Sequence, residues 1–245
     1  MRIVAVIQAR TGSTRLPGKV LEDLHGRSVL EWVVRAARSA TGLDEVVVAT
    51  STHDSDTAVA DLAASLGCPV VRGSEADVLQ RFVQAVDEHR PDAVVRLTAD
   101  CPLLDPELIG AVAGAWRGAP EHDYVSTVLV RSLPRGLDVE LATADALRRI
   151  DATATGHDRI HVTSGLYADP DTYRLLGLTV TPPSNDLRVT LDTPEDLEAL
   201  RSLVAALPGG ASRPPRWREV VSTLRSRPDL VAINAEVRQK SLEDG

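Results

Sequence analysis

The segment QARTGSTRLPGK has the composition of a phosphate-binding loop. It follows an apolar run and places the cations Arg10, Arg15 and Lys19 around backbone N–H groups near Gly12 and Ser13. Three cations on one flexible turn suit a triphosphate or a departing pyrophosphate. The alternative interpretation is a solvated surface loop that carries scattered basic residues.

Two well-known phosphate-binding motifs do not match this segment. A Walker A loop needs Gly, four residues, Gly-Lys and then Ser or Thr, but five residues separate Gly12 from Gly18, and Val20 follows Lys19. The dinucleotide fingerprint G-x-G-x-x-G fails because Thr14 stands at its second glycine. The sequence therefore favours neither a P-loop NTPase nor a Rossmann dehydrogenase.

Two aspartates follow apolar runs that predict strands. Asp100 comes after VVRLT, and Asp192 comes after LRVTL. In an open parallel sheet the ligand site lies beyond the carboxyl ends of the strands, so we expect both side chains there. Two carboxylates, phosphate oxygens and water suit the octahedral preference of Mg²⁺. Both aspartates could instead be turn residues or caps, but Asp105 and Thr193 already occupy the nearby cap positions.

The first half of the chain alternates predicted strands with predicted helices, which indicates an α/β fold with a mostly parallel central sheet flanked by helices. The predicted strands are Ile3–Ile7, Val46–Ala49, Pro69–Val71 and Ala93–Leu97. The predicted helices are Ala58–Leu66, Gly73–His89 and Asp105–Trp116. For the first of these helices we expect Asp54 or Ser55 as the N-cap and Gly67 as the stop.

The second half has a more mixed pattern. Short strands are predicted at Tyr124–Val128, Asp138–Leu141, Tyr173–Val180 and Leu187–Leu191, with helices near 143–151 and 158–168 and a last helix capped by Thr193. We expect a single domain over residues 1–245 that contains a small inserted hairpin lobe. Residues of about 1–115 would bind the nucleotide, and residues of about 120–185 would face the acceptor and supply a dimer contact.

Composition excludes several classes of protein. A net charge of −8 disfavours nucleic-acid binding, which relies on many Lys and Arg contacts to phosphates. No run of about eighteen apolar residues or signal peptide is present, so we expect a cytoplasmic protein without a membrane segment. Cys68 and Cys101 lack a metal or disulfide spacing and are expected to be buried thiols. His157 and His161 have the spacing of zinc ligands on a helix, but no third ligand is evident.

The segment AVIQARTGSTRLPGKVL resembles the signature of the nucleotide-sugar cytidylyltransferases, which include the acylneuraminate and 3-deoxy-manno-octulosonate cytidylyltransferases. The closest resemblance is to the SpsF-like branch of spore coat polysaccharide biosynthesis. It continues in order through VVVATSTHDSD, GSEADVLQRF, RLTADCPLLDP, PRGLDVE, HVT, LRVTLDTPEDLEAL and INAEVRQK. The likeness covers essentially the full chain.

This resemblance implies a GT-A-like nucleotidyltransferase fold, CTP as donor, Mg²⁺ as cofactor, pyrophosphate as product and a homodimer. The residues that it assigns are Arg10, Gly12, Ser13, Arg15 and Lys19 for the triphosphate, Asp100 and Asp192 for the metal, Ala9, Thr50, Ser51 and Asp77 for the base and ribose, and Glu140 and His161 for the acceptor. The family's Arg-Glu-His-Val-Thr motif lacks its acid here, because Ile160 precedes His161. Both a sugar-acid hydroxyl and an already anionic acceptor therefore stay open.

Two rival functions remain. A glycosyltransferase of the same fold would use a D-x-D motif, which Asp54-Ser55-Asp56 matches, but helix capping also explains these residues. Such an enzyme would leave the cationic loop without a triphosphate to neutralise. The other rival is a non-catalytic nucleotide-binding protein. Release of pyrophosphate from CTP would distinguish the predicted enzyme from both.

Overall fold

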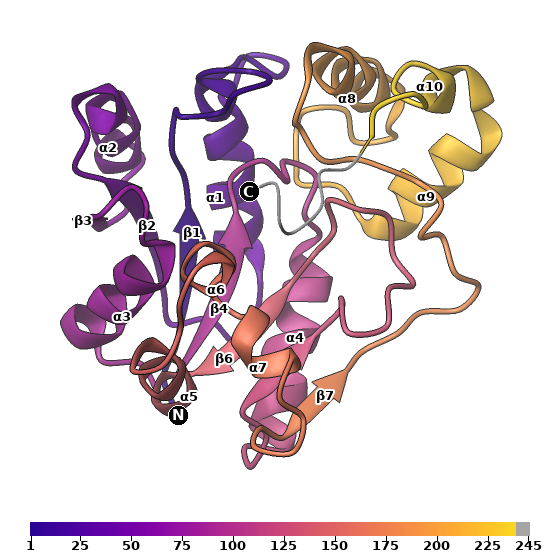
Figure 1. Ribbon diagram of the computed structural model, residues 1–245. Coiled ribbons are helices and arrows are strands. Elements are labelled where there is room, and N and C mark those ends of the chain that lie inside the picture. Colours follow the sequence, from indigo (N-terminus) through magenta and orange to yellow (C-terminus); the bar gives the residue numbers. More distant parts are fainter. Residues whose placement is uncertain (239–245) are drawn as a thin grey trace.

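A seven-stranded sheet forms the centre of the computed structural model, which describes residues 1–238 (Figure 1). The strand order is β3-β2-β1-β4-β6-β5-β7, and β6 alone runs against the other strands of this sheet. The strands are β1 (Ile3–Gln8), β2 (Glu45–Ser51), β3 (Val70–Gly73), β4 (Ala93–Thr98), β5 (Tyr124–Ser126), β6 (Glu140–Thr143) and β7 (Leu175–Gly177). The predicted α/β fold with a mostly parallel sheet is therefore confirmed.

Side chains along β1 alternate between the two faces of the sheet, and a layer of helices covers each face. Ile3, Ala5 and Ile7 belong to one buried cluster, and Val4 and Val6 belong to another, because successive side chains point to opposite faces. The first cluster is covered by α1 (Val29–Ser39), α2 (Thr57–Ser65), α4 (Pro106–Gly118), α8 (Pro194–Ala206), α9 (Trp217–Ser226) and α10 (Pro228–Ala232). The second is covered by α3 (Val78–His89), α5 (Ala144–Asp151), α6 (His157–His161) and α7 (Ser164–Tyr167). Both faces of the sheet are thus buried, as the apolar strands require.

The strand predicted at Leu187–Leu191 is wrong. This stretch makes an isolated bridge between Arg188 and Arg135 and does not join the sheet. Its apolar residues are buried in the core, which explains the strand-like alternation. The adjacent turn contains Gly136, which has φ of +101° and packs so closely that a Cβ atom would lie 2.6 Å from the backbone of Val189. The close backbone contact replaces a full strand pairing.

The expected hairpin is part of the central sheet. β5 and β6 pair in antiparallel register, with Val125 opposite Leu141, and β6 also pairs with β4. Together with β7, these two strands extend the sheet on the side opposite β3 (Figure 1). The predicted pairing is therefore present, but it lengthens the sheet and does not form a lobe of its own.

Helix caps explain several element boundaries. Asp105 caps α4 and Pro106 is its first residue, while Thr193 and Asp196 form a capping box at α8, as the sequence predicts. Gly67 adopts φ of +71° after α2, where a helix stop is expected. The predicted cap of α2 is wrong, because Asp54–Asp56 forms a short 3-10 helix, η2, and α2 begins at Thr57.

The helix predicted over Gly73–His89 begins later, at Val78, because Gly73 ends β3 and Asp77 caps the helix by accepting from the Gln80 N–H. Cys68 and Cys101 are buried free thiols, as expected. No helix within residues 1–238 has the length and apolar character that crossing a bilayer requires. The cytoplasmic location stays a prediction.

Candidate nucleotide-binding site

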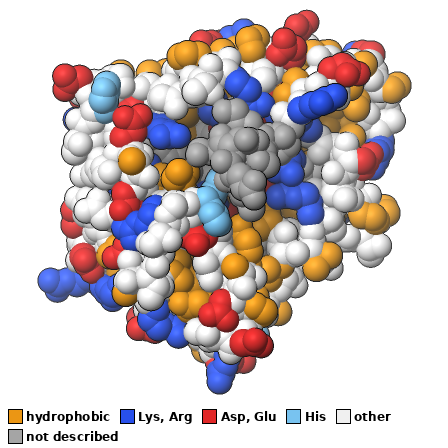
Figure 2. All heavy atoms as spheres, in the orientation of Figure 1, with side chains coloured by type: hydrophobic (Ala, Val, Ile, Leu, Met, Phe, Trp, Pro, Cys, Tyr) orange, Lys and Arg blue, Asp and Glu red, His pale blue; other side chains and the backbone are white. Residues whose placement is uncertain are grey.

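A cavity of about 340 Å³ opens at the carboxyl ends of β1 and β4. It is lined by Gln8, Ala9, Arg10, Gly12, Ser13, Thr14, Arg15, Lys19, Val20, Val78, Arg81, Arg96, Thr98, Ala99, Asp100, Ile160, His161 and Asp192. This is the edge of the sheet at which parallel α/β folds bind ligands. Basic side chains gather around the centre of the face drawn in Figure 2. The protein therefore concentrates cations locally in spite of its net charge of −8.

The cavity brings together nine of the residues singled out in the sequence. They are Ala9, Arg10, Gly12, Ser13, Arg15, Lys19, Asp100, His161 and Asp192. It does not bring in Thr50, Ser51, Asp77 or Glu140, which do not line it. The lining residues come from both the proposed nucleotide-binding part and the proposed acceptor-facing part of the chain.

The loop after β1 is held in place by Asp56. This carboxylate is 1% exposed and accepts from the Thr11 N–H and hydroxyl, each at 2.7 Å, and from the Ser51 hydroxyl at 2.5 Å. Burial raises its pKa, but these hydrogen bonds outweigh burial and lower it. Gly18, with φ of +71°, lets the loop return so that its N–H donates to the Thr11 carbonyl. Asp56 therefore supports the loop, which leaves Asp54-Ser55-Asp56 unsuited to binding a metal.

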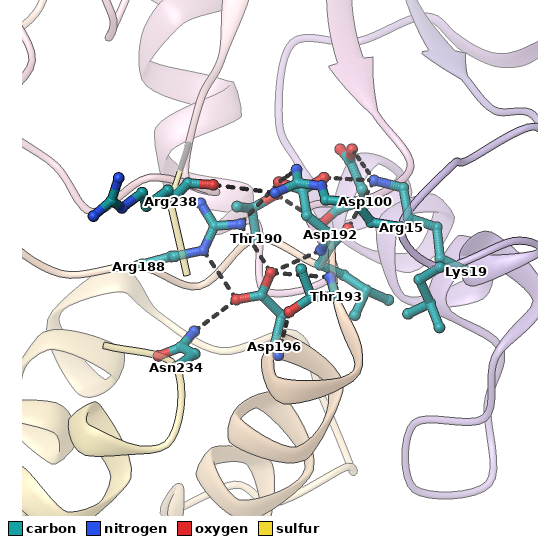
Figure 3. Close-up of polar contacts among 12 residues, drawn as sticks. Arg15, Lys19, Asp100, Arg188, Thr190, Asp192, Thr193, Asp196, Asn234 and Arg238 are labelled. Carbon is teal, nitrogen blue, oxygen red and sulfur yellow. Dashed lines mark hydrogen bonds and ion pairs between the residues drawn. The ribbon is translucent and has the colours of Figure 1, made fainter. Parts of the chain in front are cut away.

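Lys19 lies between the two predicted metal ligands (Figure 3). Its Nζ donates to Asp100 Oδ2 at 2.7 Å, to Asp192 Oδ1 at 2.8 Å and to the Leu191 carbonyl at 2.7 Å. Burial lowers the pKa of Lys19, but the two carboxylates outweigh burial and raise it. Two side chains that are far apart in the sequence thus converge on a single point.

Asp192 is fixed by cations on two sides. Besides Lys19, Arg188 donates to its Oδ2 at 2.8 Å, and the Arg15 guanidinium lies 3.1 Å from the same oxygen. Burial raises the pKa of Asp192, but Lys19, Arg188 and Arg15 lower it to about 2. The main chain also ties the two acids together, because the Leu191 N–H donates to the Asp100 carbonyl at 2.8 Å. Asp192 is therefore charged, and the backbone hydrogen bond holds the two acids at a fixed spacing.

This donor set fits a divalent cation that also binds a nucleotide. Two carboxylate oxygens that share one ammonium can share one ion in its place, and Mg²⁺ is commonly bound through one or two carboxylates together with substrate phosphates. Within residues 1–238 no group of three or more His, Cys, Asp and Glu side chains is arranged for a metal. The His157–His161 pair, whose ring centroids are 6.4 Å apart, consequently lacks the further ligands of a zinc site.

Two arginines that line the cavity were not predicted from the sequence. Arg81, on α3, is 1% exposed; it donates to the Ser74 carbonyl at 2.7 Å, and its Nε has no partner among residues 1–238. Burial and the nearby Arg10 lower its pKa. Arg96, on β4, donates to Gln8 Oε1 at 3.0 Å and pairs with Glu140. A cation inside the apolar run VVRLT, and another on the apolar face of VLQRF, are the signals that could have identified them.

Of the four predicted residues outside the cavity, Glu140 and Ser51 are connected to it through intermediate side chains. Glu140 is buried and accepts from the Tyr124 hydroxyl at 2.6 Å and the Thr163 hydroxyl at 2.5 Å, so it reaches the cavity through Arg96. Asp77 pairs with Arg159 of α6. Thr50 and Ser51 are fully buried. Ser51 acts on the loop through Asp56.

The fold and this site define a nucleotidyltransferase. A sequence model described as cytidylyltransferase matches residues 4–203. The SpsF protein of Bacillus subtilis is 32% identical, over 93% of this chain and 95% of its own, and the 3-deoxy-manno-octulosonate cytidylyltransferase of Anaeromyxobacter dehalogenans is 36% identical, over 84% and 99%. A solved cytidylyltransferase structure from Leptospira borgpetersenii superposes with a TM-score of 0.89 at 25% identity, covering 98% and 99% of the two chains. The chain belongs to the cytidylyltransferase family.

Proposed function

We propose that the protein is a Mg²⁺-dependent enzyme that transfers CMP from CTP to a sugar acid or another small anionic acceptor and releases pyrophosphate. The observation that carries this proposal is the convergence of Lys19, Asp100 and Asp192 at one point beside the cationic loop. An acceptor oxygen forms a bond to the α-phosphorus, and the bond from that phosphorus to the bridging oxygen of pyrophosphate breaks. Negative charge develops on the phosphate oxygens, so catalysis rests on positioning and electrostatics.

The cations have distinct roles in this proposal. We assign Arg10 and Arg15 to the β- and γ-phosphates, because both line the cavity from the same loop and Arg10 forms no ion pair within residues 1–238. Ser13 and Gly12 offer backbone N–H groups to the same oxygens. Lys19 neutralises the leaving pyrophosphate once it exchanges its carboxylate partners for phosphate. Asp100 and Asp192 would hold the Mg²⁺ ion, which supplies Lewis-acid polarisation of the α-phosphate.

In this proposal the acceptor and the cytosine ring of CTP occupy different parts of the cavity. His161, which lines the cavity from α6, takes the proton of a hydroxyl acceptor. Arg96 orients an anionic group of the acceptor, and Glu140 holds Arg96 for that task. Ala9 leaves room for cytosine beside β1, with Thr50 and Ser51 supporting that wall from their buried positions and Asp77 anchoring α6. An acceptor that is already anionic at its attacking atom needs no proton removal.

The test is a pyrophosphate-release assay with CTP and a panel of sugar acids, sugar phosphates and phosphonates. We expect release with CTP and one acceptor class, loss of turnover after chelation of divalent cations, and recovery with added Mg²⁺. ATP and GTP serve as matched controls, because purines would clash with the wall near Ala9. Formation of a nucleoside diphosphate from a nucleotide sugar would support the glycosyltransferase instead. CTP binding without turnover on any acceptor would favour the non-catalytic protein.

We also propose a homodimer formed through the β7 side of the sheet. β7 is an edge strand with partly exposed residues, and Val130, in the connection before β6, is 65% exposed. An edge strand and an exposed apolar side chain favour a second copy as partner. Light scattering during size-exclusion chromatography gives the molar mass, and a monomer at all accessible concentrations would contradict the dimer.

A further inference from the structure

The last described segment of the chain lies beside the candidate site. It comprises residues 234–238 and follows α10. The sequence INAEVRQK, which includes it, resembles the closing motif of the family. Its last two residues, Gln239 and Lys240, lie outside the described residues. Two contacts join the segment to the site, one through the Asn234 side chain and one through the Arg238 backbone.

Asn234 binds a buried carboxylate. Its side chain is 7% exposed, and its amide Nδ2 donates to Asp196 Oδ1 at 2.8 Å. Asp196, which is 0% exposed, also accepts from Arg188 at both oxygens, at 2.9 and 2.8 Å. Its Oδ2 accepts in addition from the backbone N–H groups of Asp192, at 2.9 Å, and Thr193, at 3.2 Å. Figure 3 shows Asp196 between Asn234 on one side and Asp192 on the other.

Asp196 thereby controls Asp192 in two ways. It holds the Asp192 backbone N–H directly, and it holds Arg188, whose guanidinium donates to Asp192 Oδ2 at 2.8 Å. Each donor to a buried carboxylate restrains its orientation, and Asp196 Oδ1 accepts from the Asn234 amide and from Arg188 Nε. Loss of the Asn234 amide leaves Arg188 as the remaining donor to this oxygen among the described residues. The Asp196 carboxylate and the Arg188 guanidinium can then shift together.

The second contact reaches the cationic loop. The Arg238 carbonyl accepts from Arg15 at 3.1 Å, and the same guanidinium lies 3.1 Å from Asp192 Oδ2. Residues 234–238 thus restrain Asp192 through Asp196 and restrain Arg15 through the backbone. Both restrained groups line the cavity.

We propose that Asn234 is a positioning residue for the nucleotide site. Through Asp196 and Arg188 it holds the Asp192 carboxylate in the orientation that shares a cation with Asp100. This inference rests on the proposed function, in which Asp192 holds the divalent cation. Groups that orient a metal ligand through hydrogen bonds change metal affinity or activity by about tenfold to a hundredfold when they are removed.

The experiment compares Asn234→Ala and Asn234→Leu with the wild-type full chain. Leu keeps the branched shape of the side chain and replaces the amide group with methyl groups, so it stays informative if the Ala variant folds poorly. Binding of Mn²⁺ in the presence of CTP is followed by electron paramagnetic resonance of the free ion. We expect about tenfold to hundredfold weaker Mn²⁺ binding and a lower kcat, with a smaller change in the KM for CTP.

The matched control is Asp229→Asn, which breaks the exposed Arg227–Asp229 ion pair at the start of α10 without touching Asp196. It should bind Mn²⁺ as the wild type does. Unchanged Mn²⁺ binding and unchanged kcat in folded Asn234→Leu, with only a lower melting temperature, would show a purely structural role and overturn the inference.

A crystal structure of Asn234→Leu separates this inference from the proposed function. Displacement of the Arg188 guanidinium and the Asp192 carboxylate relative to the wild type supports positioning, and undisturbed side chains refute it. Neither result depends on turnover. Absence of pyrophosphate release from the wild type would instead count against the proposed function.

Discussion

Replacing Lys19 with Met should strengthen the binding of a divalent cation to the free protein while it weakens turnover. The Lys19 ammonium occupies the point that Asp100 and Asp192 share, at 2.7 and 2.8 Å. A cation that binds both acids has to displace this ammonium. Methionine has a similar length and no charge, so the variant removes the competitor and keeps both carboxylates.

The pKa of Asp192 sets the size of the effect. Its fall from 3.8 to about 2, against the opposing effect of burial, corresponds to about 2 kcal/mol in favour of the charged form. Lys19 is the first of the three cations that lower this pKa, followed by Arg188 and Arg15. After the contributions of Arg188 and Arg15 and the effect of solvent screening are subtracted, about 1 kcal/mol of this stabilisation is due to Lys19. Removing the Lys19 ammonium should therefore raise the affinity for a divalent cation roughly fivefold.

The assay is titration with Mn²⁺ without nucleotide, followed by electron paramagnetic resonance, beside initial rates of pyrophosphate release. We expect affinity to rise at least roughly fivefold, while turnover falls roughly tenfold to a thousandfold because a charge-stabilising donor is lost. Arg201→Met, which removes an exposed cation that pairs with Glu22, is the control for net charge. Equal or weaker Mn²⁺ binding in Lys19→Met would refute the shared site. Unchanged turnover would remove Lys19 from the mechanism.

Two further predictions concern the loop and the acid pair. Asp56→Ala should raise the KM for CTP by about tenfold to a hundredfold, because the Thr11 N–H and hydroxyl lose a charged acceptor; initial rates at varied CTP test this, and an unchanged KM would mean that the loop holds itself. Because folding lowers the pKa of Asp192, its contribution to stability is present above its unfolded value of 3.8 and disappears as the pH falls toward 2. Urea unfolding between these pH values should show a steeper loss of stability in the wild type than in Asp192→Asn, and parallel curves would contradict the assignment.

The parts of the fold that depend on local pattern could be predicted from the sequence. Apolar runs identified β1 to β4, and Pro106 and Thr193 marked the starts of two helices. Asp100 could be placed at the sheet edge because the residue after a parallel strand has a defined location. In each of these cases a few neighbouring residues contain the whole signal. Asp192 reaches the same edge for another reason, because Leu187–Leu191 is not a strand of the sheet and the Leu191 N–H donates to the Asp100 carbonyl.

The remaining features depend on partners that are distant in the sequence. Asp54-Ser55-Asp56 matched both a D-x-D motif and helix capping, but the Asp56 carboxylate accepts from Thr11, on another loop, and from Ser51. Leu187–Leu191 has the alternation of a strand, yet its burial comes from packing beside the turn at Gly136 and not from the sheet. Arg96 could be recognised as unusual, but its partner Glu140 lies on a strand whose pairing the sequence does not reveal.

The backbone hydrogen bond between Leu191 and Asp100 has a consequence for how such enzymes diversify. The chain from Cys101 to Thr190 connects the two acids, and its ends are joined by a backbone N–H and a carbonyl, which every amino acid except proline supplies. Segments between Cys101 and Thr190 can change in length and composition while the spacing of the two acids is preserved. Under the proposed function, one pair of acids could therefore be combined with new acceptor-binding segments by altering only the chain between Asp100 and Asp192.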